Sequence, residues 1–438
     1  MGRSRYLRAV HAGPEGGIDP EEPEPLLECL VGVSERIGRP AVLVAMDDMS
    51  AIAVSRVAPM LTDRFRIPHQ PDDLPARVAD KAELSRLCAR WGVPHPETVI
   101  PASGEEAARA AWRLGLPVVA KWSRPWLLPA GAGLRSTVLV NTAADARRLY
   151  ERSDEAGSRL LLQRFLPAGP DTDWFFHGAF ARGGRPLLAG SGRKELSWPV
   201  RTGLTAVGRW LPDPAVEESA LRLAERLGYQ GILDLDFRRD ECGTFRLVDF
   251  NPRPGAQFRL FADDSGLDVV QAVYLDLTGQ RVPTPAGGPG RVFVAENYAL
   301  LAAVRGRTLP RRAAAGPAGP TVAGPAETAP GAGGRDARPG PVRVLPRGER
   351  ARVEAAWFAP DDLRPFLAML GAFLGRGFGK GARVLRGVPA QGRRTVRAVR
   401  TPRQRGGERP WPGSRPPGPA AGEAPPGASA EPDELVSR

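Results

Sequence analysis

Two short segments of the chain carry acidic, amide and basic side chains at alternating positions, a spacing that can bind a cation and phosphate. GILDLDFRRD contains Asp234 and Asp236, and FRLVDFNPRPG contains Asp249, Asn251 and Arg253. Both segments are predicted strands, and side chains on one strand alternate between the two faces of a sheet. The short DECG turn between them predicts a hairpin that brings the two sets together.

Carboxylates gathered on one face repel one another unless a cation neutralises them. Magnesium takes hard oxygen ligands from a few carboxylates and completes its shell with phosphate oxygens and water. Asp236, Asp249 and Asn251 are therefore candidate magnesium ligands. Asp234 is more simply explained as a solvated polar residue on an open sheet face.

Lysine is scarce in this chain. Because Arg is used almost wherever a positive charge is needed, each Lys is a candidate for a position that requires a compact ammonium group. Lys121 ends an apolar strand and is the hardest to explain as a surface residue. Of the 61 Lys and Arg residues, the lysines are Lys81, Lys121, Lys194 and Lys380.

The elements that must position these residues follow in order along the chain. From about 40 to 75 the pattern is strand, loop and helix, as in the first turn of an open α/β sheet, where ligands gather at strand ends. Asp80 is expected to cap a helix that ends near Gly92. Further predicted elements are helices at 105–115, 143–154, 212–229 and 268–280, strands at 116–122 and 159–167, a glycine-containing loop at 129–137 and a hairpin at 175–194.

The composition changes after residue 307. Residues 308–350 are rich in Ala, Gly, Pro and Arg and are predicted to be a disordered low-complexity linker, because they bury too little apolar surface to offset the entropy of ordering. Residues 351–387 recover a helical pattern with aromatic residues that we expect to pack on the main body. The remainder, 388–438, is a predicted disordered basic tail.

The net charge of +12 belongs mainly to this end of the chain. Residues 376–415 contain twelve basic residues and one acid, so the rest of the chain is close to neutral. We therefore expect no nucleic-acid or other polyanion partner for the main fold, and any such partner would involve the tail only. The chain has no apolar run near the roughly 20 residues needed to span a bilayer, and its N-terminus lacks a secretory pattern. We expect a cytoplasmic protein that does not bind a membrane, and three separate cysteines that are small buried hydrophobes rather than disulfide or metal sites.

Five motifs, in order along the chain, resemble those of the ATP-grasp superfamily of ligases. They are ADKAELSRLCARWGVPHPET, LGLPVVAKW, LLLQRFLPAG and the two strands GILDLDFRRD and FRLVDFNPRPG, and the similarity covers roughly residues 40–285. The runs GSGRKELSWPVRTG and LGYQGILDLDFRRD look most like the D-aspartate-ligase-like group of carboxylate-amine ligases.

The resemblance implies an α/β (α+β) ATP-grasp fold, in which two α+β subdomains clasp ATP. Residues 1–78 would form an N-terminal Rossmann-like pre-ATP-grasp domain, and 79–285 the ATP-grasp domain, with a lid subdomain at about 115–162. Residues 286–307 would be a strand and helix extension.

The resemblance also implies roles for individual residues. Lys81 and Lys121 would contact ATP phosphates, and Asp236, Asp249 and Asn251 would hold one or two magnesium ions. Arg253 would stabilise the transferring phosphoryl group. The remaining implied contacts are Gln163, Arg164 and Leu166 with adenine, Asp173 with ribose, and Arg193 and Lys194 with phosphate or the substrate carboxylate.

The implied activity is that of an ADP-forming enzyme that couples a small carboxylate to an amine with ATP and magnesium, through an acyl phosphate. Asp stands at both carboxylate positions where the superfamily usually has Glu, and PAGAGLRST has fewer glycines than usual. These departures leave open the alternative of a degenerate nucleotide-binding protein without ligase turnover. The sequence does not specify the acid, the amine or the oligomeric state.

Overall fold

The computed structural model describes residues 3–71, 73–129, 131–169, 171–199, 203–308 and 352–386. The chain divides into two units, Met1–Lys380 and Gly381–Arg438, and everything below concerns the first. The predicted linker, apart from its first residue, and the predicted basic tail both lie outside the described residues. No helix in the described ranges is long and apolar enough to cross a membrane.

The N-terminal part of the first unit is helical, with a small sheet. Strands β1 and β2 pair in parallel, and the apolar run that predicts a strand before Asp47 contributes only its first two residues to β1. Asp47 caps α2 by accepting a hydrogen bond from the Ser50 amide at 2.8 Å. The elements here are α1 (Glu24–Ile37), β1 (Ala41–Val42), α2 (Asp48–Val57), β2 (Phe65–Arg66) and α3 (Leu74–Ala79).

Helix α4 (Lys81–Trp91) begins and ends at the residues that the sequence predicts. Asp80 caps it, and Gly92 ends it in a left-handed conformation with φ 65°. A left-handed residue after a helix favours glycine, which has no Cβ to clash with the backbone.

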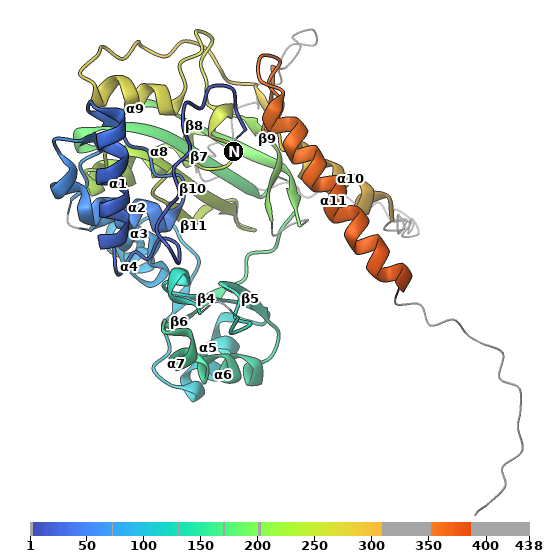
Figure 1. The fold of residues 1–438 in the computed structure, drawn as a ribbon. Helices are drawn as coiled ribbons and strands as arrows, with labels where there is room; N and C mark the ends of the chain where they lie inside the picture. Colours follow the sequence, from blue (N-terminus) through green and yellow to red (C-terminus); the bar gives the residue numbers. More distant parts are fainter. Residues whose placement is uncertain are drawn as a thin grey trace, which may run out of the picture. The chain divides into compact units, whose positions relative to one another are not determined.

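An antiparallel four-stranded sheet follows, with strand order β3-β6-β4-β5. One face of this sheet packs against helices through a core that includes Ala107, Leu114, Val118 and Leu160, and Figure 1 shows β4–β6 together with α5–α7. The strands are β3 (Thr98–Val99), β4 (Val118–Trp122), β5 (Thr137–Val140) and β6 (Leu160–Arg164), and the helices are α5 (Gly104–Leu114), α6 (Ala143–Tyr150) and α7 (Ser153–Ala156).

The larger sheet has seven strands in the order β11-β10-β7-β8-β9-β12-β13. Its neighbours are antiparallel except for β12 and β13, which are parallel. The strands are β7 (Asp173–Ala181), β8 (Arg185–Trp198), β9 (Leu204–Trp210), β10 (Gly231–Arg239), β11 (Phe245–Asn251), β12 (Val292–Val294) and β13 (Val353–Ala355).

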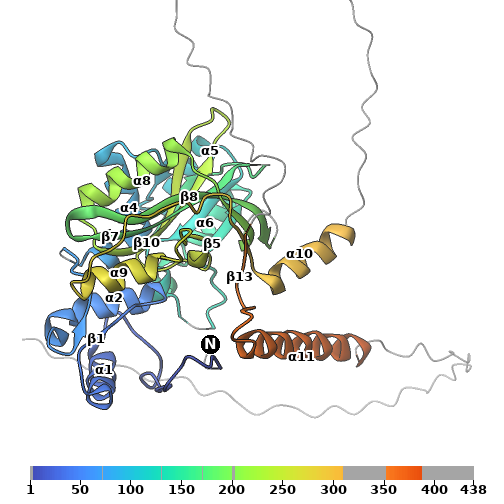
Figure 2. The same cartoon turned by 90° about the horizontal axis from the view of Figure 1, so that it is seen from above.

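Helices cover both faces of this sheet, and strand alternation divides its apolar side chains between two cores. Helix α8 (Pro214–Leu227) packs with Phe176 and Leu233 on one face, and α9 (Val269–Leu277) packs with Phe175 and Ile232 on the other. Figure 2 shows the two helices on opposite sides of the sheet. Asp234 and Asp236 follow Ile232 at alternate positions and therefore point toward the α9 face.

The β7–β8 hairpin turns at two glycines, as its sequence predicts. Gly183 and Gly184 have φ values of 77° and 76°. A Cβ on Gly184 would lie 2.6 Å from the carbonyl oxygen of Ala224 in α8. Glycine is therefore required here for both conformation and close approach.

The described C-terminal part of the first unit contains α10 (Glu296–Thr308), β13 and the part of α11 (Arg364–Arg386) up to Lys380. The segment with the predicted helical pattern thus begins with an edge strand, and its helix starts only at Arg364. Pro365 suits the first turn of α11, where its missing N–H is not needed. Among the cysteines, Cys88 is buried as predicted, whereas Cys242 is exposed and Cys29 is half-buried, so the expectation was wrong for these two.

Candidate active site

The β10–β11 hairpin brings the acidic residues together in the predicted manner. In its register Asp236 pairs with Asp249 and Asp234 pairs with Asn251. An irregularity in the pairing follows Asp236, and bulges of this kind re-aim side chains near functional sites. Two carboxylates therefore face one another across the two strands.

Each of these two carboxylates has a lysine partner from another element. Lys194 Nζ of β8 lies 2.7 Å from Asp236 Oδ1, and Lys81 Nζ, at the start of α4, contacts Asp249 Oδ1. A third ammonium, that of Lys121 at the end of β4, donates to the carbonyl of Val248 at 2.9 Å. Three of the four lysines in the chain thus lie around one hairpin.

Burial and the neighbouring charges shift the pKa values of these groups in opposite directions. Burial raises the pKa of Asp236 above its ordinary range, although Lys194 opposes the rise. At Asp249 burial is outweighed by Lys81 and Lys121, so its pKa is lowered. Burial lowers the pKa of Lys121 to about 8, although the Asp249 charge opposes that fall. At Lys194 burial is outweighed by Asp236, and its pKa is raised.

The guanidinium of Arg253 is held by three oxygen-bearing side chains. Its Nε lies 3.1 Å from Asp48 Oδ1, one terminal nitrogen donates to Asn251 Oδ1 at 3.1 Å, and the other lies 3.5 Å from Asp234 Oδ2. The Asn251 amide in turn donates to Asp234 at 3.3 Å. These contacts fix the planar guanidinium in one orientation.

Asp234 is buried rather than solvated, so the simple expectation for this residue was wrong. Its Oδ1 lies 2.8 Å from Nε2 of His177, a fully buried residue in β7, whose ring stacks on Phe261 at 5.1 Å. Burial alone would raise the pKa of Asp234, but His177 and Arg253 outweigh it and the pKa is lowered. His177 was missed because only the pairing of β7 with β10 brings it to Asp234.

A cleft of about 940 Å³ lies over this hairpin. Asp48, which was not singled out from the sequence, also lines it. Arg238, another residue not singled out from the sequence, lines it as well. Of the residues proposed from sequence, the cleft is lined by Lys121, Asp173, Lys194, Asp236, Asp249, Asn251 and Arg253.

Two curated proteins are similar in sequence to about half of this chain. No protein-family model matches the sequence. The carbamoyl phosphate synthase large chain, C-terminal section, of Methanopyrus kandleri is 26% identical over 244 residues, which is 52% of this chain and 43% of the relative. The D-alanine–D-alanine ligase of Pseudomonas putida is 25% identical over 223 residues, which is 48% of this chain and 66% of the relative. Both relatives are ATP-grasp ligases.

Over about half of its length the chain is therefore similar in sequence to ATP-grasp ligases. It spans less than half the length of the first of these relatives and just under two thirds of the second. Among solved structures, a biotin carboxylase from Campylobacter jejuni in a β,γ-ATP complex is similar with a TM-score of 0.49 and 17% identity, over 62% of each chain.

The segment at the end of β6, which contains Gln163, Arg164 and Leu166, does not line the main cleft. Gln163 donates to Thr98 Oγ1 at 3.0 Å, and Arg164 forms an ion pair with Glu97 at 2.6 Å. Leu166 is buried, and its carbonyl accepts a hydrogen bond from Arg238 at 3.1 Å. Arg164 and Leu166 instead line a separate recess of about 540 Å³.

Asp173 lines the cleft over the β10–β11 hairpin, whereas Arg193 does not. Asp173 lines it and forms an ion pair with Arg238 at 2.7 Å. Arg193 is not among the lining residues and forms an ion pair with Asp171 at 2.7 Å. The physical reason is strand alternation, which directs Arg193 and Lys194 to opposite faces of β8.

The side chains of the β10–β11 hairpin offer hard oxygen atoms as ligands for a magnesium ion. Within the described ranges, no three His, Cys, Asp or Glu side chains converge closely enough to hold a metal ion by themselves. Asp236 Oδ1 is buried and lies near Lys194 without a well-directed hydrogen bond. Asp236, Asp249 and Asn251 therefore fit a magnesium ion that takes one or two carboxylates and shares phosphate oxygens.

Proposed function

We propose that the chain is an ATP-dependent, magnesium-requiring carboxylate-amine ligase that forms an amide or peptide bond and releases ADP. The observation that supports this most directly is the pair of facing carboxylates at the wall of one cleft, Asp236 and Asp249. Each of them forms an ion pair with a lysine from a different element, Lys194 and Lys81. Such alternation of positive and negative groups suits a polyphosphate together with its cation.

The proposed roles are those that the resemblance to ATP-grasp ligases implies for these residues. Lys81 and Lys121 would bind the phosphates of ATP, and Asp173 the ribose hydroxyls. Lys194, close to Asp236, would bind the γ-phosphate or the substrate carboxylate. Arg253, held at three points, would stabilise the transferring phosphoryl group. The adenine ring would lie at the end of β6, where it would contact the Gln163 side chain and the backbone of Arg164 and Leu166.

The reaction would proceed in two displacements. An oxygen of the acid attacks the γ-phosphorus, the bond between that phosphorus and the bridging oxygen of ADP breaks, and an acyl phosphate forms. The amine then attacks the acyl carbon, phosphate leaves with the carbon–oxygen electron pair, and the amine nitrogen loses a proton.

The protein contributes mainly position and charge to both displacements. Phosphoryl transfer depends chiefly on holding the reacting groups in line and neutralising charge. The ammonium groups of Lys121 and Lys194 and the guanidinium of Arg253 provide fixed positive charge at the cleft wall. Magnesium, when bound by Asp236, Asp249 and Asn251, would supply further charge neutralisation to the phosphates.

A second candidate function is nucleotide binding without ligation. It is favoured by the ion pairs that already neutralise Asp236 and Asp249 with Lys194 and Lys81. The shorter reach of Asp compared with Glu at both positions favours it as well. In that case Mg·ATP would bind, but no acid and amine would be joined.

The test is ADP release from Mg·ATP with a panel of amino acids and hydroxy acids as acids and of amines as acceptors. Release that requires both an acid and an amine, and that is lost in Lys121→Ala and Asp249→Ala, would support the ligase. Arg109→Ala, which changes an exposed residue of α5, is the matched control. Mg·ATP binding by calorimetry with no turnover over the whole panel would support the second function, and normal turnover of both variants would remove these residues from the mechanism.

A further inference from the structure

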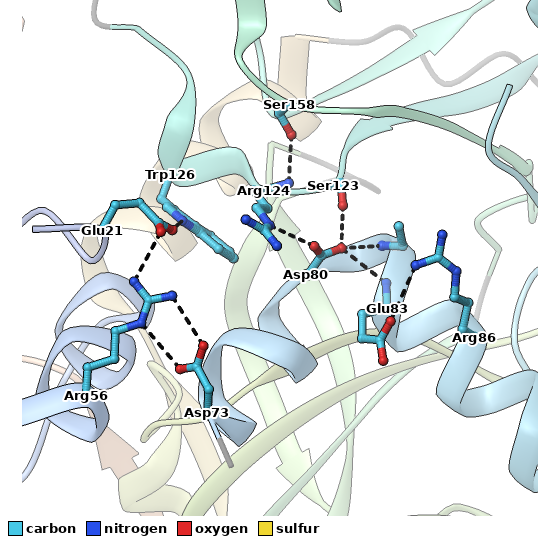
Figure 3. A network of polar contacts seen from close by, with 11 residues as sticks. Glu21, Arg56, Asp73, Asp80, Glu83, Arg86, Ser123, Arg124, Trp126 and Ser158 are labelled. Atoms are coloured by element: carbon cyan, nitrogen blue, oxygen red, sulfur yellow. Dashed lines mark hydrogen bonds and ion pairs between the residues drawn. The ribbon is translucent and has the colours of Figure 1, made fainter. Parts of the chain in front are cut away.

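Asp80 is a buried carboxylate at the start of α4, with a relative exposure of 3% and with every oxygen in use. Its Oδ1 accepts from the amides of Ala82 at 2.9 Å and Glu83 at 3.1 Å, and also from the Ser123 hydroxyl. Its Oδ2 accepts from Arg124 Nε at 3.0 Å. Figure 3 shows these contacts converging on Asp80.

The same contacts join the two segments that carry Lys81 and Lys121. Lys81 directly follows Asp80 as the first residue of α4, and Lys121 lies two positions before Ser123. The Lys81 amide donates to the Ser123 carbonyl at 2.8 Å. Two kinds of hydrogen bond, one from the Asp80 side chain and one between backbone groups, therefore connect the start of α4 to the end of β4.

The segment after Ser123 is itself held on both sides. The amide of Arg124 donates to Ser158 Oγ at 2.9 Å, and the Trp126 indole donates to Glu21 at 3.3 Å. Figure 3 shows Glu21 linked in turn to Arg56 of α2. Asp80 thus bonds to a segment, Ser123 and Arg124, that other contacts already hold between the four-stranded sheet and the N-terminal helices.

Helix capping alone does not explain this residue. Asp213 caps α8 through the amides of Ala215 and Val216, which belong to its own helix. Asp80 makes the corresponding two bonds and adds a hydroxyl and a guanidinium from another element. At Asp80 burial would raise the pKa, but the bonds from Ser123 and Arg124 outweigh it and keep the carboxyl ionised.

We propose that Asp80 is a positioning residue that sets the spacing of the Lys81 and Lys121 ammonium groups by tying the start of α4 to the end of β4. This inference rests on the proposed phosphate-binding roles of the two lysines. Asp80 itself does not line the cleft. Its effect would therefore be specific for the phosphates of a nucleotide and not for the nucleoside part.

The experiment compares the affinities of the full chain for Mg·ATP and for adenosine, measured by calorimetry or by competition. Asp80→Ala should weaken Mg·ATP binding about 10- to 100-fold, as expected when charge-assisted hydrogen bonds that orient a group are lost. Adenosine affinity should be unchanged. Asp80→Asn keeps an acceptor for the three donors at Oδ1 but presents an amide to Arg124, so its effect should be intermediate.

Asp213→Ala is the matched control, because it removes an aspartate cap at a helix that does not contact the cleft. It should lower the melting temperature and leave Mg·ATP affinity unchanged. Should Asp80→Ala not fold, Asp80→Asn and Arg124→Ala provide the same comparison. Equal weakening of ATP and adenosine, or an effect on ATP no larger than that of Asp213→Ala, would overturn the positioning role.

Different results would overturn the proposed ligase function and the positioning role of Asp80. A wild-type chain that binds no Mg·ATP would overturn the proposed function and this inference with it. A wild-type chain that binds Mg·ATP, together with Asp80 variants that bind it equally well, would overturn only the inference.

Discussion

Asp236 and Asp249 are direct cross-strand partners in the β10–β11 hairpin, and each is neutralised by its own lysine. Like charges placed directly opposite each other destabilise a sheet. The two ammonium groups offset that repulsion in the structure. A bound cation would add to the same effect, so the stability of this hairpin and its affinity for Mg·ATP should be linked.

The ion pair between Lys81 and Asp249 can be measured by a double-mutant cycle. We expect Lys81→Met and Asp249→Asn each to lower the free energy of unfolding by about 2 kcal/mol, because each leaves a charge without its partner. The coupling free energy should be about 1 kcal/mol, since Asp249 is one-third exposed and partly screened. Denaturant unfolding at pH 7 gives both quantities. The cycle of Lys194→Met with Asp249→Asn is the control, and an equally large coupling there would contradict the specific pairing.

Lys121 predicts a pH dependence of stability, because its pKa in the folded chain is about 8 and that of an unfolded lysine is about 10.4. Between these values the unfolded chain binds more protons than the folded one, so the contribution of this residue to stability increases as pH rises. Below pH 8 both states are protonated, and the cost of burying the charge is fully present. The free energy of unfolding of the wild type relative to Lys121→Met should therefore rise from pH 8 to 10. A difference that stays flat over this range would contradict the lowered pKa.

Nucleotide affinity should have the opposite dependence on pH. As Lys121 loses its proton above about pH 8, the ammonium available to phosphate disappears and the Kd for Mg·ATP should increase. Lys121→Arg should remove this dependence, because a guanidinium remains charged throughout. Calorimetric titrations at pH 7 and pH 9.5 provide the comparison. An equal increase of Kd in Lys121→Arg would assign the dependence to another group.

The buried pair of His177 and Asp234 should be costly to break from one side. His177→Phe keeps an aromatic ring against Phe261 but removes the partner of Asp234 Oδ1, and we expect a loss of about 3 kcal/mol in the free energy of unfolding. Because the pKa of Asp234 is lowered in the folded chain, its stabilising contribution is present at neutral pH and is lost as pH falls through that pKa. The variant should therefore show a weaker loss of stability on acidification. His95→Ala, at a half-buried histidine bonded to a neighbouring carbonyl, is the control and should retain the wild-type dependence.

Arg253 should not tolerate lysine. Its guanidinium contacts Asp48, Asn251 and Asp234 through different nitrogens, whereas a lysine has a single ammonium. For the proposed ligase, Arg253→Lys should lower kcat about 100-fold and change the KM for ATP little. Arg259→Lys, at a half-buried ion pair with Glu354 outside the cleft, should behave like the wild type. A rise in KM with unchanged kcat would mean that Arg253 serves ground-state binding only.

Features that depend on local rules could be predicted from the sequence. Strand alternation and a short turn predict that Asp236 faces Asp249, and capping rules predict the start of α4 at Asp80 and its end at Gly92. The family resemblance correctly indicated the ATP-grasp superfamily. Each of these signals is carried by short, continuous stretches of the chain.

Other features depend on the order and register of distant strands, which local rules do not specify. His177 meets Asp234 only because β7 pairs with β10, and the solvated explanation of Asp234 failed for that reason. Arg193 and Lys194 look equivalent as a basic dipeptide, but the sheet directs only Lys194 to the cleft. The second role of Asp80 likewise requires β4 to end beside α4, which no capping rule predicts.

The contact between Arg253 and Asp48 limits how far this protein can be divided into independent modules. Asp48 is the first residue of α2, which precedes the segment that contains both larger sheets. A shortened chain that starts at residue 79 would keep those sheets but would remove one of the three anchors of the guanidinium. Grafting residues 79–308 onto another N-terminal region would therefore require an acidic residue at the place of Asp48.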